Sequence, residues 1–250
     1  MRKILLICFI QFTFIAYACD CMPPNLTQKY VQSDFVANIT IIKIYPNKKN
    51  EHGYKADIKI NELFKGEKLS SIYVYGRSDN GIGTSCDIFI PSGTKLIAYA
   101  SKNTQGNFGI GMCSGLLYFK NKNSKRNNRE IEILKLFKER GITFTDKINY
   151  REKATLNKEL KQFKGIEVKN TFGIYAITFD SNLNIKYVSE ISGFGTTIDK
   201  KLMEILKKTE WNSFNKGIQN KVPENSKLLI GIYYYPREKG NQSFLTHYFL

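Results

Sequence analysis

Residues 35–44 read FVANITIIKI, and their apolar side chains follow a pattern of period two. One side of an extended chain would carry four of them, namely Phe35, Ala37, Ile39 and Ile41. This alternation is typical of a strand with one face in a core. The pattern then shifts, because Ile42 and Ile44 continue the apolar set. One inserted residue at 41–42 would produce the shift, so we predict a β-bulge that bends the strand.

Further short strands are predicted in the first half of the chain. After a short helix over 26–33, the strand candidates are 35–44, 55–60, 71–75, 95–100 and 109–117. Strand patterns that recur this often, with at most one helix, predict a small all-β barrel or sandwich of five strands.

The second half has a mixed pattern and predicts a small α+β domain with an antiparallel sheet. A polar, basic segment at 121–128 is the expected boundary, so we divide the chain into 19–120, a basic linker and helix at 121–151, and 152–250. Asn127 and Glu130 have capping-box spacing for a helix that ends at Gly141. The remaining candidates are helices at 152–163 and 196–209, a hairpin of 172–179 with 185–191, and a closing strand at 228–235.

The first eighteen residues resemble a secretory signal. Arg2 and Lys3 precede an apolar run, and the small residues Ala16 and Ala18 favour cleavage before Cys19. No second apolar stretch reaches membrane-spanning length. We therefore expect a secreted, periplasmic or cell-envelope protein whose mature chain has no transmembrane segment. Lipid attachment to Cys19, as in a lipoprotein, is the alternative.

Four cysteines remain after cleavage: Cys19, Cys21, Cys86 and Cys113. An even number in an exported chain predicts two disulfides, with three connectivities open. A structural zinc site is the alternative, but such sites usually have two paired C-x₂₋₄-C units, and here one C-x-C faces two isolated cysteines. We expect no intrinsic metal and no cofactor.

The chain is basic, with a formal charge of +16 and a Lys-rich segment at 120–129. Such a charge attracts nucleic acid, anionic lipid or an acidic partner, or simply forms a well-solvated surface. Export and disulfides argue against nucleic acid, so we interpret the charge as a solvated surface.

The N-terminal part, residues 19–119, resembles the tissue inhibitors of metalloproteinases and the wider netrin-like group. The matching features, in order, are a C-x-C at the mature N-terminus, Ser33-Asp34-Phe35-Val36, Phe64-Lys65-Gly66, Cys86, and Gly93 followed by Leu96-Ile97. The resemblance implies an OB-fold barrel with disulfides Cys19–Cys86 and Cys21–Cys113. It also implies that an extracellular zinc metalloprotease is the partner.

In animal members of that family, the α-amine and carbonyl of the first cysteine chelate the zinc of the target protease. By resemblance Cys19 would take this role, and a neutral amine is a good zinc ligand. The second residue contacts the specificity pocket of the protease. Here it is Asp20, whereas family members carry a small or apolar residue, and an unpaired carboxylate is costly to bury.

The C-terminal part, residues 153–235, resembles the C-terminal domain of TonB-type proteins. The matching features are a strand ending at Ile177-Thr178-Phe179-Asp180, a second strand reaching Gly193, Ile198-Asp199 at a helix start, and Trp211 before Gly217. In that family the domain binds extended peptide at a sheet edge, which implies an envelope protein or peptide as partner.

No motif indicates an enzyme. The two histidines, His52 and His247, lie far apart, and no H-E-x-x-H, G-x-S-x-G or P-loop sequence occurs. Trp211 follows an amphipathic helix, so we expect it to pack in a core. The sequence therefore predicts a non-enzymatic binding protein, either a metalloprotease inhibitor or an envelope scaffold that binds peptide.

Overall fold

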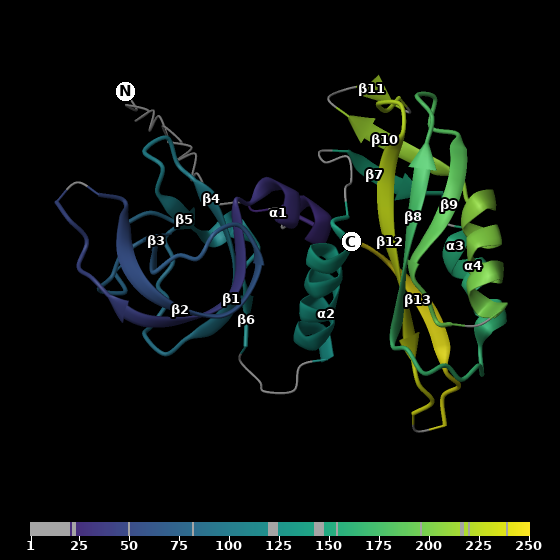
Figure 1. The fold of residues 1–250 in the computed structure, drawn as a ribbon, viewed down its shortest axis with the longest axis horizontal. Coiled ribbons are helices and arrows are strands. Elements are labelled where there is room, and N and C mark those ends of the chain that lie inside the picture. Colours follow the sequence, from purple (N-terminus) through teal and green to yellow (C-terminus); the bar gives the residue numbers. More distant parts are fainter. Residues whose placement is uncertain are drawn as a thin grey trace, which may run out of the picture.

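A β-barrel and an open β-sheet lie on opposite sides of one helix, α2 (Lys125–Arg140) (Figure 1). The computed structural model describes residues 21, 24–49, 51–81, 83–119, 125–142, 148–153, 155–195, 197–215, 218–219, 221–238 and 240–250. The expected signal peptide, its cleavage site, Cys19 and Asp20 lie outside these residues.

The barrel follows the short helix α1 (Leu26–Gln32). Its strands are β1 (Phe35–Ile44), β2 (Gly53–Lys65), β3 (Ser71–Tyr75), β4 (Lys95–Lys102) and β5 (Phe108–Ile110), with β6 (Leu117–Tyr118) added beside β4. The order is β1-β2-β3-β5-β4, and pairing of β1 with β4 closes the ring. Among the strand pairs of the described barrel residues, the β3–β5 pair alone is parallel. The predicted closed barrel of five strands is confirmed.

The period-two pattern of β1 fills the barrel. The apolar set predicted to share one side is fully buried in the barrel core, namely Phe35, Ala37, Ile39 and Ile41. The predicted bulge is also confirmed, because the register to β2 shifts between Ile41 and Lys43. Ile42 is the extra residue and is 51% exposed, which returns Ile44 to the side of the core.

The expected strand at 109–117 was wrong. The segment contains β5, a single 3-10 turn (η1, Met112–Ser114) and the two-residue strand β6. Gly115 follows the turn with a φ of 69°, in the left-handed region that favours glycine. The turn interrupts the strand and places Cys113 at the surface.

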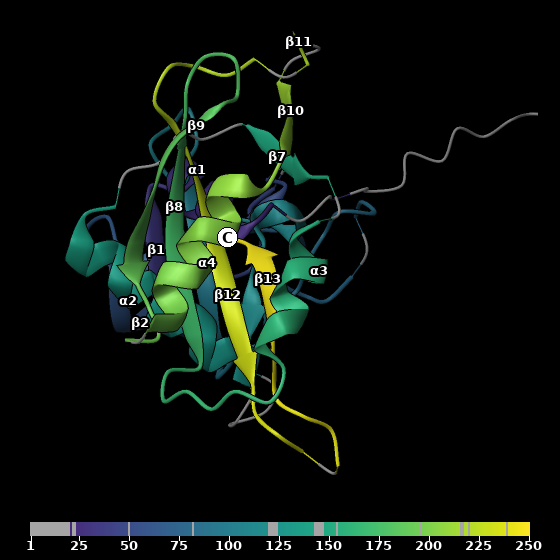
Figure 2. The same ribbon diagram turned by 90° about the vertical axis from the view of Figure 1, so that its right-hand side faces the viewer.

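The second half forms a four-stranded antiparallel sheet in the order β13-β12-β8-β9. Its strands are β8 (Phe172–Phe179), β9 (Ile185–Ser192), β12 (Ser226–Tyr235) and β13 (Phe244–Phe249). The helices α3 (Leu156–Leu160) and α4 (Thr197–Lys208), with a 3-10 turn (η2, Lys161–Phe163), cover the face away from the barrel (Figure 2). A smaller sheet joins β7 (Asn149–Glu152), β10 (Trp211–Asn215) and β11 (Ile218–Gln219).

The hairpin of β8 and β9 and the helix α4 agree with the sequence, whereas three other expectations need correction. The helix expected at 152–163 is shorter, because Glu152 ends β7 and its carboxylate accepts a hydrogen bond from the Leu156 amide. The strand over 226–235 is not the last one, because β13 follows it. Finally, α2 begins at Lys125 rather than near Asn128, inside the segment expected to be a linker.

Helix α2 connects the two halves through a shared core. Its buried residues Ile133, Leu134 and Phe137 contribute about 1.5–3 kcal/mol each. They pack with residues of the barrel wall and of the open sheet, namely Val36, Phe64, Ile97, Tyr99, Ile174, Ala176, Leu229, Tyr233 and Leu250. The other face of the sheet packs on α3 and α4, so the sheet is buried on both sides.

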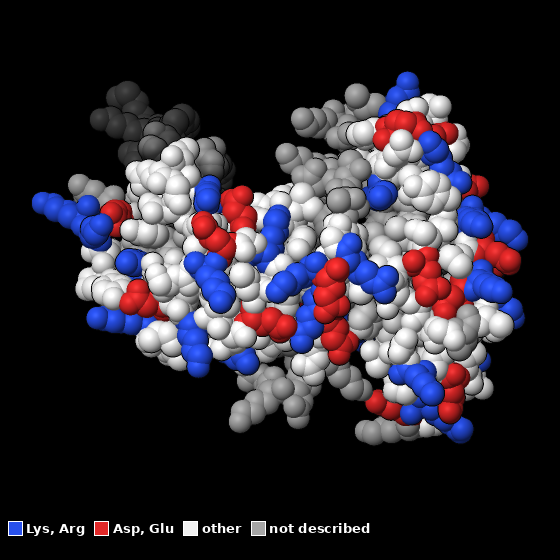
Figure 3. Space-filling view, viewed as in Figure 1, with Lys and Arg blue, Asp and Glu red and all other residues white. Residues whose placement is uncertain are grey.

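The surface carries charges of both signs. On the face seen in Figure 3, acidic side chains are interspersed among the Lys and Arg side chains over the barrel, α2 and the sheet. Among the described residues, no helix is long and apolar enough to cross a membrane.

Candidate functional site

The Cys21–Cys113 disulfide ties the chain ahead of α1 to the turn after β5. The two Cα atoms are 5.3 Å apart, across a sequence separation of 92 positions. This pairing, implied by the inhibitor resemblance, is present. It is the one disulfide that lies wholly within the described part of the chain. Cys86 is disulfide-bonded as well, but its expected partner, Cys19, lies outside the described residues.

A pocket of about 410 Å³ lies beside this disulfide. Most of its lining is apolar or sulfur-containing, and includes Pro24, Tyr75, Cys86, Tyr99, Met112 and Cys113. Met112 is 48% exposed and Tyr75 is 43% exposed. Cys86 and Cys113 are exposed too. We call this surface the disulfide pocket. Exposed apolar side chains gathered around a pocket are typical of a binding surface.

Two glycines hold Tyr75 in the disulfide pocket. A Cβ on Gly109 would lie 2.6 Å from the Tyr75 hydroxyl, and one on Gly111 would lie 3.2 Å from its ring. The ring therefore lies directly over the backbone of β5, where other residues would displace it. The exposed ring is thus placed by packing against the strand and is not a solvated side chain free to move.

The floor of the disulfide pocket is electrically neutralised. Lys29 lies there, and its Nζ is 2.7 Å from Oε1 of Glu130. The same oxygen accepts a hydrogen bond of 2.6 Å from the Tyr99 hydroxyl. Burial, followed by the neighbouring carboxylate, raises the pKa of Tyr99 well above its usual value, so this hydroxyl stays protonated and donates. The disulfide pocket therefore favours an apolar or neutral group.

The cysteines that line the disulfide pocket, Cys86 and Cys113, are disulfide-bonded and so offer no thiolate. Among the described residues, no group of three or more His, Cys, Asp or Glu side chains is arranged to hold a metal ion.

The fold brings Cys21, Cys86 and Cys113 of the predicted site to this surface. The two residues expected to contact a protease, Cys19 and Asp20, lie outside the described residues, so their roles stay predictions. Sequence reasoning missed Tyr75 and Met112. The glycines on either side of Ile110 are the only local signal, because they mark a backbone that something approaches closely.

Trp211 packs in the core, as predicted. It is 5% exposed and meets Phe179 and Phe249 edge to face, with ring centroids 6.3 and 6.1 Å away. It therefore does not offer a binding aromatic at the surface.

In comparisons with known proteins, no protein-family model matches this chain, and no curated protein matches it significantly.

Proposed function

We propose that this chain is an exported, non-enzymatic binding protein that contacts a partner protein through the disulfide pocket. The observation that carries the proposal is the exposure of Met112 and Tyr75 beside the Cys21–Cys113 disulfide. An interface of this type depends on a few apolar and aromatic anchors at its centre. The bridge holds the surface rigid, which lowers the entropy lost on binding.

The partner class proposed from the inhibitor resemblance is a secreted zinc metalloprotease. Cys19 stands two residues before the bridged Cys21 in the sequence, which is why we connect the proposed zinc ligand with the disulfide pocket. The α-amine and carbonyl of Cys19 would then approach a protease zinc while Met112 and Tyr75 contact the protease surface. An OB-fold barrel and a Cys19–Cys86 disulfide complete this proposal.

The test is inhibition of a panel of secreted zinc metalloproteases by the mature protein. We expect N-terminal acetylation, which removes the amine lone pair, to abolish inhibition. Met112→Asp should weaken it at least about tenfold, because a carboxylate would be buried without a partner. Ile42→Asp is the matched control, since Ile42 is equally exposed but does not line the disulfide pocket.

Inhibition that survives acetylation would exclude the zinc-capping role of Cys19. If no protease is inhibited, the same Met112→Asp and Ile42→Asp pair tests binding in general, in pull-downs from envelope extract. Equal recovery of partners by both variants would then exclude the disulfide pocket as the binding surface.

A second candidate function, peptide binding, is favoured by the edge strand β13. The Leu250 amide donates to Leu229 of β12, and the antiparallel register then directs the amides of Phe244, Thr246 and Tyr248 toward β12 as well. The backbone groups of Leu245, His247 and Phe249 point to the edge of the sheet that does not face β12. Among the described residues, no element other than β12 pairs with β13. An extended peptide could pair there, as the TonB-like resemblance implies.

Amide hydrogen exchange tests this second function. A bound envelope peptide should slow exchange at Leu245, His247 and Phe249 and leave the amides already paired to β12 unchanged. Slowed exchange at the opposite edge, β9, with no change at β13 would place the peptide elsewhere.

A further inference from the structure

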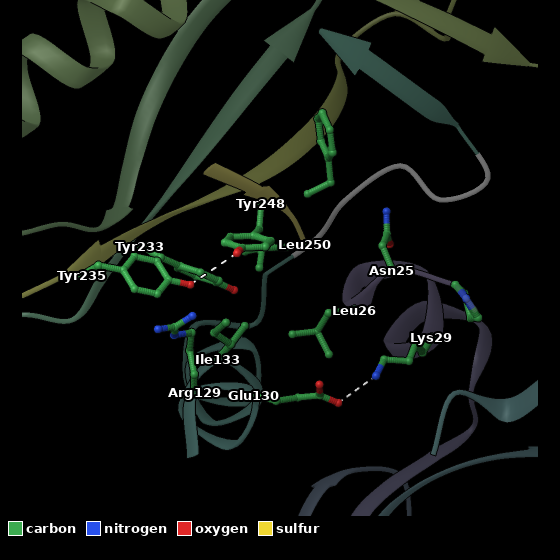
Figure 4. Close-up of a pocket in the computed structure, with 12 residues that line it drawn as sticks. Asn25, Leu26, Lys29, Arg129, Glu130, Ile133, Tyr233, Tyr235, Tyr248 and Leu250 are labelled. Atoms are coloured by element: carbon green, nitrogen blue, oxygen red, sulfur yellow. Dashed lines mark hydrogen bonds and ion pairs between the residues drawn. The ribbon is translucent and has the colours of Figure 1, made fainter. Parts of the chain in front are cut away.

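A second pocket, of about 480 Å³, lies where α1, α2, β12 and β13 meet (Figure 4). Its volume is within the usual range for small-molecule sites. One part of the wall is apolar and includes Leu26, Ile133 and Phe249, and the other carries Arg129, Tyr235 and Tyr248. We call it the interdomain pocket. It needs both halves of the molecule, because neither the barrel side nor the sheet provides a complete wall.

Arg129 is the cation of the interdomain pocket. Its guanidinium carbon lies 3.9 Å from the centroid of the Tyr233 ring and 5.8 Å from that of Tyr235. Stacking on the aromatic rings holds the planar group in place without using its N–H donors. Among the described residues, no carboxylate pairs with it, and its side chain is only partly buried.

Two tyrosine hydroxyls stand beside the guanidinium. The oxygens of Tyr235 and Tyr248 are 3.3 Å apart, and the contact raises the pKa of Tyr248. Burial raises the pKa of Tyr233 to about 12. These hydroxyls are therefore protonated at neutral pH. Either hydroxyl can be the donor of this contact, so one of the two hydroxyl hydrogens is directed away from it and can be donated to an acceptor outside the pair.

The other charged side chains of the interdomain pocket pair with each other. Lys29 and Glu130 form an ion pair, so among the charged side chains of the lining Arg129 is the one that no carboxylate side chain neutralises. A single planar guanidinium matches one carboxylate in a bidentate geometry. A dianionic phosphate would leave a charge unbalanced in a partly buried site. The apolar part of the wall, which includes Leu26 and the partly exposed Phe249, suits a hydrocarbon or aromatic body.

We propose that the interdomain pocket binds a small organic monocarboxylate, whose carboxylate pairs with Arg129 and whose apolar body packs on Leu26 and Phe249. The proposal is independent of the partner proposed for the disulfide pocket. A ligand here contacts both the helices next to the barrel and the open sheet, so its binding stabilises the contact between the two halves.

Calorimetry with the full mature protein tests the proposal, with 4-phenylbutyrate as the probe. The uncharged 4-phenylbutanol has the same body and should bind at least about tenfold more weakly, because it cannot form the charged pair. Inorganic phosphate supplies an anion without a body. Tighter binding of the alcohol or of phosphate than of the carboxylate would overturn the ligand class.

Variants of the lining residues then test whether 4-phenylbutyrate binds in the interdomain pocket. Arg129→Gln should weaken binding of 4-phenylbutyrate at least about tenfold, and Tyr248→Phe should weaken it severalfold, through loss of one donor. Arg140→Gln is the matched control, because Arg140 is an exposed arginine on the same helix. The affinity of this variant for 4-phenylbutyrate should stay within about twofold of that of wild type.

A separate variant distinguishes the two pockets, which share Pro24 and Lys29. Met112→Asp should leave binding of 4-phenylbutyrate unchanged even if it abolishes partner binding. Shifts of the Ile133 and Leu26 methyl signals on titration should locate the probe, and circular dichroism should verify that each variant folds. Absence of binding to wild type, or equal affinities of the Arg129→Gln and Arg140→Gln variants, would overturn the proposal.

Discussion

Lys29 and Glu130 are 101 positions apart in the sequence and form an ion pair that is about nine-tenths buried, with 2.7 Å between Nζ and Oε1. The pair joins α1 to α2 at the wall of the barrel. The carbonyl of Gly115 and the hydroxyl of Tyr99 provide further hydrogen bonds. A buried ion pair is tolerated when further hydrogen bonds satisfy its donors and acceptors, and these two bonds contribute to that here.

The first prediction concerns this pair. Glu130→Gln should destabilise the protein by about 3 kcal/mol, because it leaves the Lys29 ammonium buried without its counter-charge. Urea denaturation measures the loss. The control is Lys135→Gln on the same helix, whose ion pair with Glu62 is 3.3 Å long but largely exposed, so its effect should be below about 1 kcal/mol. Equal losses of stability in the two variants would mean that the buried ion pair contributes no more to the free energy of unfolding than the exposed one.

The second prediction separates backbone strain from steric overlap at two glycines. Gly66 and Gly93 both have a φ of +85°. A Cβ on Gly93 meets nothing within 4 Å, whereas one on Gly66 overlaps the backbone carbonyl of Asp34. Gly93→Ala should lower the free energy of unfolding by about 1 kcal/mol, from backbone strain alone. Gly66→Ala should lower it by about 3 kcal/mol, because steric overlap is added to the strain. Equal losses of stability in thermal or urea unfolding would show that the backbone at Asp34 can move to accommodate the Cβ without a further loss of stability.

The third prediction concerns the disulfide. The double variant Cys21→Ser, Cys113→Ser should lose up to about 4 kcal/mol of stability, because the bridge closes a long loop in the unfolded chain. The same variant should weaken partner binding, because the turn that carries Met112 is then no longer linked covalently to the segment before α1. Unchanged unfolding of the variant would show that the bridge does not restrict the unfolded chain.

The fourth prediction is a pH dependence of stability through His247 on β13. Burial lowers the pKa of His247, and the charge of Glu152 only partly opposes this. The folded state therefore binds the proton less readily than the unfolded chain. The stability from neutral His247 is present above the unfolded pKa of about 6.5 and is lost as the pH falls toward the lower folded pKa.

Unfolding midpoints measured between about pH 7.5 and about pH 5.5 check this sign. Wild type should lose more stability over that range than His247→Gln, in which the titrating group is absent. His52→Gln, at an exposed position, should behave like wild type. A steeper loss in His247→Gln than in wild type would contradict the prediction.

Much of the barrel was predictable because its strands obey a local rule. In β1, each second residue enters the core, so the alternation and its shift at Ile42 were visible in one segment. The third strand, Ser71–Tyr75, was predicted with its observed bounds. The turn at Met112–Ser114 was not predicted from the local alternation. The structure shows that it carries Cys113, which is bridged to the distant Cys21.

In the C-terminal part, too, some elements were predicted from their local pattern and others depend on distant contacts. The hairpin around Asp180 has a polar turn between two apolar runs and was found from sequence. The last strand, Phe244–Phe249, was missed. Its pattern is mixed, with Tyr248 exposed and Leu245 buried, and it forms a strand because β12 offers it a partner.

By itself, the sequence determined the period-two core of the barrel, the bulge that bends its first strand, and the cysteines available for bridges, because these depend on neighbours within a few residues. Only the tertiary structure decided that adjacent residues of one helix contact different halves, Glu130 the barrel side and Arg129 the sheet. The contacts of Glu130 with Lys29 and of Arg129 with Tyr233 join residues about a hundred positions apart. The local periodicity of a sequence does not show which distant side chains will come into contact.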